Sequence, residues 1–368
     1  MAAMELTDGE FDPEDVFVRE VRRILGGAAH LNLIMAGKLG TGKSTLLNGI
    51  FGEDLAETGV GASVTTIIKR HTRPGSPVAV YDTPGIELGR DHQQVIADYI
   101  AEIRKNAGDP GQRIHFALYC VRSTDRRFEA YEKEVIEQLA EEVPVFVVFT
   151  QCLAADDEDT LALAEFVNGL GLNIRDGRVF LTLAKSRTIG GVTFEGFGLP
   201  ELVTAIYRSL PEAAAQTLAR HQRVSLAVKV AEAESQVRVA AAAAAAIATV
   251  PIPVLDAIPL SALQFTMLAR ITTVMGLKVN IKAIVLAMAG IMGVAAVARQ
   301  VARQFLKLFP GIGSVINAGM AAEITKKMGR VYVEACTRVC QRQIDGEDIT
   351  ADDATDAIIE EFRRLWTN

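Results

Sequence analysis

Between residues 31 and 183 the chain alternates short apolar runs with longer amphipathic stretches. The apolar runs cover residues 31–36, 78–81, 114–120, 143–149 and 179–183, and the amphipathic stretches fall around 92–105, 128–141 and 157–170. Nearly continuous apolar strands that alternate with helices are typical of a parallel sheet with helices on both faces. The more polar segment 66–72 predicts an edge strand that runs antiparallel to residues 78–81.

The pattern changes near Pro200, after which the apolar positions follow a helical period. Residues 211–248 predict one long helix, which contains seven consecutive alanines near its end and is broken by Pro251 and Pro253. Asp12 and Pro13 predict the start of a short helix before the first strand. Further helices are expected over residues 259–275, 281–308, 312–328, 330–343 and 350–366.

These elements predict an α/β domain followed by an all-α helical domain. We place an N-terminal helical extension at residues 1–29, the α/β domain at 30–210 and the helical domain at 211–368. A chain of 368 residues is long enough for two domains of ordinary size.

Charge is distributed unevenly along the chain. Residues 241–340 hold ten Lys or Arg against three Asp or Glu, although the net charge of the whole chain is -7. A basic, apolar region indicates either an anionic partner such as a membrane surface, or a buried bundle with solvated cationic ends. The uncharged run 283–298 is shorter than the roughly 20 residues that span a bilayer. We therefore expect bundle helices, and the alternative is an amphipathic surface that enters the membrane interface.

The four cysteines predict buried free thiols. Cys120 and Cys152 fall in or beside predicted central strands, and Cys336 and Cys340 share one helix face with no histidine near them in sequence. The N-terminus is acidic and polar and carries no secretory signal. We therefore expect a cytoplasmic protein, with peripheral membrane association as an option.

The segment GKLGTGKS, residues 37–44, follows the first predicted strand and opens a predicted helix. Its glycines let successive backbone amides point at phosphate oxygens, at the positive end of the helix. Lys43 is expected to reach the β- and γ-phosphates, and the Ser44 hydroxyl is expected to bind Mg²⁺. The segment predicts a phosphate-binding loop with contacts from Gly37, Leu39, Gly40, Thr41, Gly42, Lys43, Ser44 and Thr45.

The tetrapeptide DTPG, residues 82–85, comes directly after the strand at 78–81. The Asp82 carboxylate can hold Mg²⁺ through a water, and the Gly85 amide can contact the γ-phosphate. Thr65 and Thr66 lie between the two motifs, and a Thr hydroxyl there would complete the Mg²⁺ shell only while the γ-phosphate is present. We prefer Thr65 over Thr66, and assign the catalytic roles to Lys43, Thr65 and Gly85.

The order of motifs resembles the Era-related branch of P-loop GTPases. The motifs are GKLGTGKS, SVTT, DTPG, a strand that ends in Phe149-Thr150-Gln151, and Leu183-Ala184-Lys185. The phosphate loop is especially similar to that of septins and immunity-related GTPases. The segments VPIPVLDAIPLSALQF and PGIGSVINAGMAAEITKKMGRVYVEA resemble a helical domain of unknown function that accompanies some bacterial members. The resemblance covers about residues 30–340 and implies GTP or GDP, together with Mg²⁺, as ligands.

The resemblance also implies where the base binds. Thr150, Gln151, Ala184 and Lys185 match the two base-binding motifs. These GTPases usually read guanine with Asn-Lys-x-Asp or Thr-Lys-x-Asp, whose carboxylate accepts hydrogen bonds from N1 and N2. Leu153 stands in the place of that Asp, and the nearby Asp156 and Asp157 are candidate substitutes. The rest of the pattern still favours GTP.

Ile86 stands where many of these GTPases carry the Gln that orients the attacking water. Isoleucine cannot form that hydrogen bond, so we expect slow GTP hydrolysis that is activated by a partner or by self-association into a nucleotide-dependent homodimer or oligomer. By analogy with dynamin-like proteins, the helical domain is expected to move as a lever, near or on a membrane surface. No nucleic-acid partner is expected. The alternative is a nucleotide-gated protein-binding module with negligible turnover.

Overall fold

The computed structural model describes residues 12–27, 29–52, 68–83, 92–247, 257–291 and 318–367. The chain divides into two compact units. One is the α/β unit, Ala28–Val228, and the other is the helical unit, which combines Met1–Gly27 with Lys229–Asn368. The helical unit is therefore built from two stretches that are far apart in the sequence.

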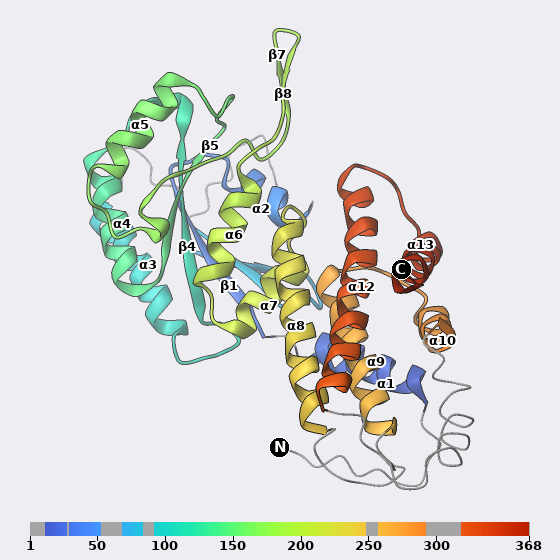
Figure 1. Cartoon of the computed structure of the whole chain (residues 1–368). Helices are drawn as coiled ribbons and strands as arrows, with labels where there is room; N and C mark the ends of the chain where they lie inside the picture. Colours follow the sequence, from blue (N-terminus) through green and yellow to red (C-terminus); the bar gives the residue numbers. More distant parts are fainter. Residues whose placement is uncertain are drawn as a thin grey trace, which may run out of the picture. The chain divides into compact units, whose positions relative to one another are not determined.

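A six-stranded sheet forms the centre of the α/β unit (Figure 1). The strand order is β2-β3-β1-β4-β5-β6, and every neighbouring pair is parallel except β2 with β3. The mostly parallel sheet and its antiparallel edge strand confirm the predicted topology. The strands are β1 (Leu31–Gly37), β2 (Lys69–Thr72), β3 (Val78–Asp82), β4 (Ile114–Arg122), β5 (Val145–Thr150) and β6 (Phe180–Leu181).

Helices cover both faces of this sheet, as the apolar runs predict. In β1, Leu33 and Met35 point to one face while Ile34 and Ala36 point to the other, because side chains alternate along a strand. The first face packs on α2 (Lys43–Phe51), α6 (Leu199–Ser209) and α7 (Glu212–His221). The second face packs on α3 (His92–Asn106), α4 (Ala130–Glu142) and α5 (Glu158–Asn168).

The end of the α/β unit lies beyond the boundary predicted at residue 210. Helix α7 belongs to this unit, because Ala214 and Leu218 are buried in the core that covers the sheet. The Thr217 hydroxyl also donates a hydrogen bond to the carbonyl of Ala29, at 2.7 Å. The unit ends at Val228.

Residues 211–248 do not form the single helix predicted for them. Helix α7 ends at His221, and α8 (Leu226–Ile247) starts after a short break. The buried side chain of Gln222 closes the break, since its oxygen accepts from the amides of Val224 (2.9 Å) and Ser225 (2.8 Å). This hydrogen bonding satisfies the backbone where the helix stops.

The helical unit contains α1 (Pro13–Gly26), the greater part of α8, α9 (Ala257–Met275), α10 (Ile281–Ile291), α12 (Ala318–Ile344) and α13 (Ala351–Thr367). Helix α1 packs against α9 and α10. Its Asp12 cap accepts from the amide of Glu14, which confirms the predicted start. Helix α1 is thus part of the helical unit rather than a separate extension. Of the helix predicted over 281–308, the part beyond 291 lies outside the described residues.

Helix α12 is continuous where two helices, 312–328 and 330–343, were predicted. Gly329 lies at the predicted break, but its lack of a side chain serves packing. A Cβ atom there would lie 2.6 Å from Val237 of α8 and 2.9 Å from the Met267 sulfur of α9. Glycine therefore lets three helices approach closely without interrupting one of them.

All four cysteines are buried and unpaired, as predicted. Within the described ranges, no helix is both long enough and apolar enough to cross a membrane.

Candidate functional site

The loop between β1 and α2 curls through three glycines in conformations that other residues rarely adopt. Gly37, Gly40 and Gly42 have φ angles of 129°, 73° and 82°. Gly37 is also required by space, because a Cβ atom there would lie 2.2 Å from the carbonyl oxygen of Cys120 on β4. These glycines carry the backbone from the end of the central strand into the first turn of α2, where unpaired amides are exposed to a ligand.

The Lys43 side chain folds back over this loop. Its ammonium donates to the carbonyls of Gly37 (3.2 Å) and Lys38 (3.0 Å). Desolvation lowers the pKa of Lys43, and the negative potentials of Cys120 and Asp82 only partly oppose this. The lysine is therefore an ammonium held within the loop at a cost in solvation, a cost that an anion bound there would reduce.

Side chains from the ends of β4 and β5 hold the loop from outside. The Thr150 hydroxyl donates to the carbonyl of Thr41. Arg122 and Gln151 both donate to the carbonyl of Gly40, at 2.7 and 3.2 Å. Gln151 has a left-handed φ of 59°, so backbone strain accompanies its position. The loop is thus fixed by Thr150 and Gln151, which the sequence motifs assigned only to base binding, and by Arg122, for which no role was predicted.

The side of the site predicted to hold a metal is partly described. Ser44 lies in the first turn of α2, and Asp82 ends β3 beside Met35 of the neighbouring strand. The Thr83 hydroxyl donates to the Met35 carbonyl at 2.6 Å and fixes the chain just after Asp82. The predicted switch residues Thr65 and Thr66, together with Gly85 and Ile86, lie outside the described residues.

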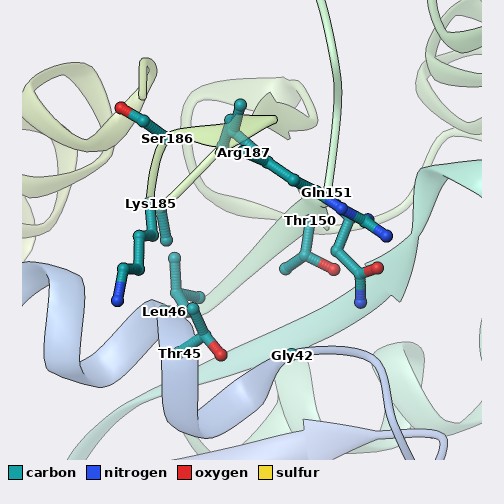
Figure 2. Close-up of a pocket in the computed structure, with 10 residues that line it drawn as sticks. Gly42, Thr45, Leu46, Thr150, Gln151, Lys185, Ser186 and Arg187 are labelled. Carbon is teal, nitrogen blue, oxygen red and sulfur yellow. The ribbon is translucent and has the colours of Figure 1, made fainter. Parts of the chain in front are cut away.

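A pocket of about 240 Å³ continues from the phosphate loop (Figure 2). It brings together three elements, namely the start of α2, the end of β5 and the segment that follows β6. Thr150, Gln151, Ala184 and Lys185 meet in it, as the resemblance implied, whereas Leu39 is not among its lining residues. The lining residues are Gly42, Thr45, Leu46, Thr150, Gln151, Leu183, Ala184, Lys185, Ser186 and Arg187.

Neither candidate substitute for the missing guanine-reading Asp lines this pocket. Asp157 caps α5, where its carboxylate accepts from the amide (2.9 Å) and the hydroxyl (2.6 Å) of Thr160. These hydrogen bonds lower the pKa of Asp157. Asp156 is exposed, and Leu153 is outside the lining as well. Ser186 and Arg187 also line the pocket, and no sequence motif predicted them, although they directly follow Lys185.

A buried ion pair supports the first turn of the loop. Lys38 donates to Glu132 of α4 at 3.2 Å, and the Glu132 side chain is 0% exposed. The same carboxylate accepts from the amide of Glu129 at 2.8 Å and closes a capping box at the start of α4. Burial raises the pKa of Glu132 although the Glu129 amide and Lys38 favour its charged form.

The substitution Lys38→Met is expected to lower the free energy of unfolding by about 3 kcal/mol at pH 8, because it leaves the buried Glu132 charge without a cation. Protonation of Glu132 relieves this loss, so the loss should shrink as the pH falls toward 4.5, the ordinary pKa of glutamate. Urea unfolding at pH 8 and pH 5 measures both effects. The double variant Lys38→Met with Glu132→Gln should recover much of the loss, and an equal loss at both pH values would contradict the assignment.

Residues 32–151 match the family model described as 50S ribosome-binding GTPase. No curated protein matches the chain at a significant level.

Solved structures to which part of this chain is similar include three GTPases. The septin GTPase domain from Chlamydomonas reinhardtii is 14% identical over 51% of this chain and 89% of that chain, with a TM-score of 0.36. A GDP·AlF4⁻-bound variant of Era from Aquifex aeolicus is 20% identical over 50% of this chain and 58% of that chain, with a TM-score of 0.35. Toc33 from Arabidopsis thaliana, in complex with Mg²⁺ and GMPPNP, is 16% identical over 57% of this chain and 94% of that chain, with a TM-score of 0.34. The family match and the sheet topology together make the α/β unit a P-loop GTPase domain, which is accompanied by a region of helices.

Proposed function

We propose that the chain is a Mg²⁺-dependent switch that binds GTP and GDP and hydrolyses GTP. The observation that carries this proposal is the continuity of two sites. A glycine-rich loop with an ammonium folded over it leads directly into a pocket where Thr150–Gln151 and Ala184–Lys185 meet. A nucleoside triphosphate needs both parts, since its phosphates take the loop and its base takes the pocket.

The residues at the phosphate end suit a nucleotide-bound Mg²⁺. Ser44 offers a hydroxyl and Asp82 a carboxylate, which are the hard oxygen ligands that Mg²⁺ prefers beside substrate phosphates. The described residues contain no cluster of three or more His, Cys, Asp or Glu side chains that could hold a metal ion without the nucleotide. When bound beside Ser44 and Asp82, Mg²⁺ would neutralise part of the phosphate charge. Lys43 would hold the β- and γ-phosphate oxygens. We propose that Thr65 and Gly85 complete the site when the γ-phosphate is present.

We propose that hydrolysis is slow in the isolated chain. Ile86 follows Gly85 and offers no polar group to orient water. A second copy or another protein would then supply the missing group, and the helical unit would transmit the nucleotide state to that partner or to an anionic membrane surface. A specific GTPase rate that rises with protein concentration supports self-association. A negligible rate at every concentration instead favours a nucleotide-gated binding module.

Nucleotide titration is the direct test. With Mg²⁺ present, GTP and GDP are expected to bind the full chain, and ATP is expected to bind at least tenfold more weakly, a difference of about 1.4 kcal/mol. Isothermal titration calorimetry with the three nucleotides measures this ratio. Equal binding of ATP and GTP would overturn the guanine assignment, and no binding of any of them would overturn the nucleotide site itself.

A further inference from the structure

Among the residues that the structure describes, the walls of the base pocket carry cationic groups but no carboxylate. Among its lining residues, Lys185 and Arg187 are the charged ones, and the other polar side chains are hydroxyls and the amide of Gln151. Guanine is usually selected through the donors at N1 and N2, for which a carboxylate is the natural partner. The described lining of this pocket therefore offers no charged hydrogen-bond acceptor to the N1 and N2 donors of guanine.

Guanine has a second distinguishing edge. Its O6 and N7 are adjacent hydrogen-bond acceptors, whereas adenine presents N7 as an acceptor and N6 as a donor. A guanidinium group offers two parallel donors, which fit the O6 and N7 pair of guanine and meet a like donor at N6 of adenine. A pocket with an available arginine can therefore discriminate between the two bases without any carboxylate.

Arg187 occupies the position that such reading requires. It begins β7 (Arg187–Ile189), which pairs with β8 (Val192–Phe194) in an exposed hairpin after the base-binding motif. In Figure 2 its side chain extends from the hairpin toward Gln151, which lines the same pocket. Its guanidinium makes no hydrogen bond or ion pair with any other residue in the described part of the chain, so its donors are available to a ligand.

The neighbouring polar side chains are directed elsewhere. The Ser186 hydroxyl donates to Glu195 at 2.8 Å, and in Figure 2 it points away from Gln151. The amide nitrogen of Gln151 donates to the carbonyl of Gly40. In Figure 2 the ammonium of Lys185 points toward α2 rather than toward Gln151. Of the charged side chains in the described lining, Lys185 and Arg187, it is Arg187 that reaches across the pocket.

We infer that Arg187 is a specificity-determining residue, which selects guanine by donating to O6 and N7 in place of the carboxylate lost at position 153. This inference rests on the proposed function, since it concerns the base of the same nucleotide. It predicts that the 2-amino group of guanine contributes little to binding, whereas O6 and N7 contribute strongly.

Base analogues separate the two modes of reading. Inosine triphosphate keeps O6, N7 and N1–H but lacks the 2-amino group, so it should bind the full chain almost as tightly as GTP. 7-Deaza-GTP lacks N7, and 2,6-diaminopurine riboside triphosphate carries an amino group in place of O6, so both should bind more weakly. If a carboxylate instead recognised N1 and N2, inosine triphosphate would bind much more weakly than GTP, because it lacks the 2-amino group.

Substitutions of Arg187 test whether this residue causes the preference for guanine. Arg187→Ala should reduce the preference for GTP over ATP by about tenfold, because a bidentate arginine–guanine pair contributes about 1–3 kcal/mol of discrimination. Arg187→Lys keeps the charge without the paired donors and should recover little of the preference. Arg175→Ala, an exposed arginine outside the pocket, is the matched control and should bind like the wild type.

The outcomes distinguish this inference from the proposed function. If GTP is preferred but inosine triphosphate binds far more weakly, or if Arg187→Ala keeps the wild-type preference, the role of Arg187 is wrong and the nucleotide site stands. If the wild-type chain binds no nucleotide, the proposed function itself fails. Arg187 is exposed on the hairpin, so its replacement should leave the unfolding transition unchanged, and this is checked in the same samples.

Discussion

Replacing Lys43 by alanine should raise the dissociation constant of GTP by about 100-fold, because hydrogen bonds between the ammonium and the β- and γ-phosphates contribute about 3 kcal/mol. The lysine already lies over the loop, with its ammonium 3.0 Å from the carbonyl of Lys38. Calorimetric titration of the variant measures the loss. Lys105→Ala, which removes an exposed lysine of α3 paired with Glu102, is the control and should bind normally.

The same variant has a pH signature in the nucleotide-free protein. Desolvation lowers the pKa of Lys43 from its ordinary value of 10.5, so the unfolded chain binds the proton more tightly than the folded one. The stability of the nucleotide-free protein should therefore rise as the pH increases toward 10.5, and Lys43→Ala should lack this rise. Wild-type affinity in Lys43→Ala would contradict the placement of phosphates in the loop.

Gly37→Ala should destabilise the α/β unit by about 3 kcal/mol or more, because backbone strain and a steric clash coincide at this position. The added Cβ would meet the Cys120 carbonyl at 2.2 Å, and β4 is a central strand that cannot move aside. Gly75→Ala is the matched control. Its φ of 75° is also positive, but open space surrounds the position, so it should cost only about 1 kcal/mol.

Two probes can assign this loss to one unit. Trp366 is the single tryptophan of the chain and stacks on Phe362 within α13, so its fluorescence reports on the helical unit. Far-UV circular dichroism reports on both units. In Gly37→Ala the circular dichroism transition should begin at lower urea while the Trp366 transition stays near its wild-type midpoint. Equal shifts of both probes would contradict a defect confined to the α/β unit.

The sequence predicted the sheet and the phosphate loop well, because both have strong local signals. Apolar runs identified the buried strands, and the glycine spacing of residues 37–44 identified the loop. The hairpin of β7 and β8 was missed, since its strands are mostly exposed and have no buried face to create an alternating pattern. Its turn at Gly190 and Gly191 was the available signal.

Errors in the helices beyond residue 210 arose because helix breaks were inferred from the local sequence alone. Gly329 resembles a break in sequence, but its role depends on Val237 and Met267, which lie far away along the chain. Gln222 resembles an ordinary helical residue, and only the tertiary structure shows that its buried amide closes a turn. Both cases depend on contacts between elements, which one-dimensional periodicity does not record.

In the candidate site, the motifs predicted which segments meet but not what each side chain does there. Thr150 and Gln151 line the pocket as expected, yet they also hold the phosphate loop through hydrogen bonds to Thr41 and Gly40. Asp157 had suitable chemistry to replace the missing carboxylate, but capping α5 occupies it. Asp157 was a candidate because it lies close to Leu153 in the sequence, but its carboxylate caps α5 instead.

The assignment of α1 to the helical unit has a consequence for synthesis of the chain on the ribosome. Helix α1 precedes the α/β unit in the chain and so emerges before it, whereas its packing partners α9 and α10 follow the entire α/β unit. At about 5–20 residues per second, translation of the intervening part takes roughly 10–50 s. The apolar face of α1, which includes the fully buried Phe17, stays without its partners during this interval. All segments of the α/β unit precede α9 and α10 in the chain, so this unit can complete its own core while α1 still waits for its partners.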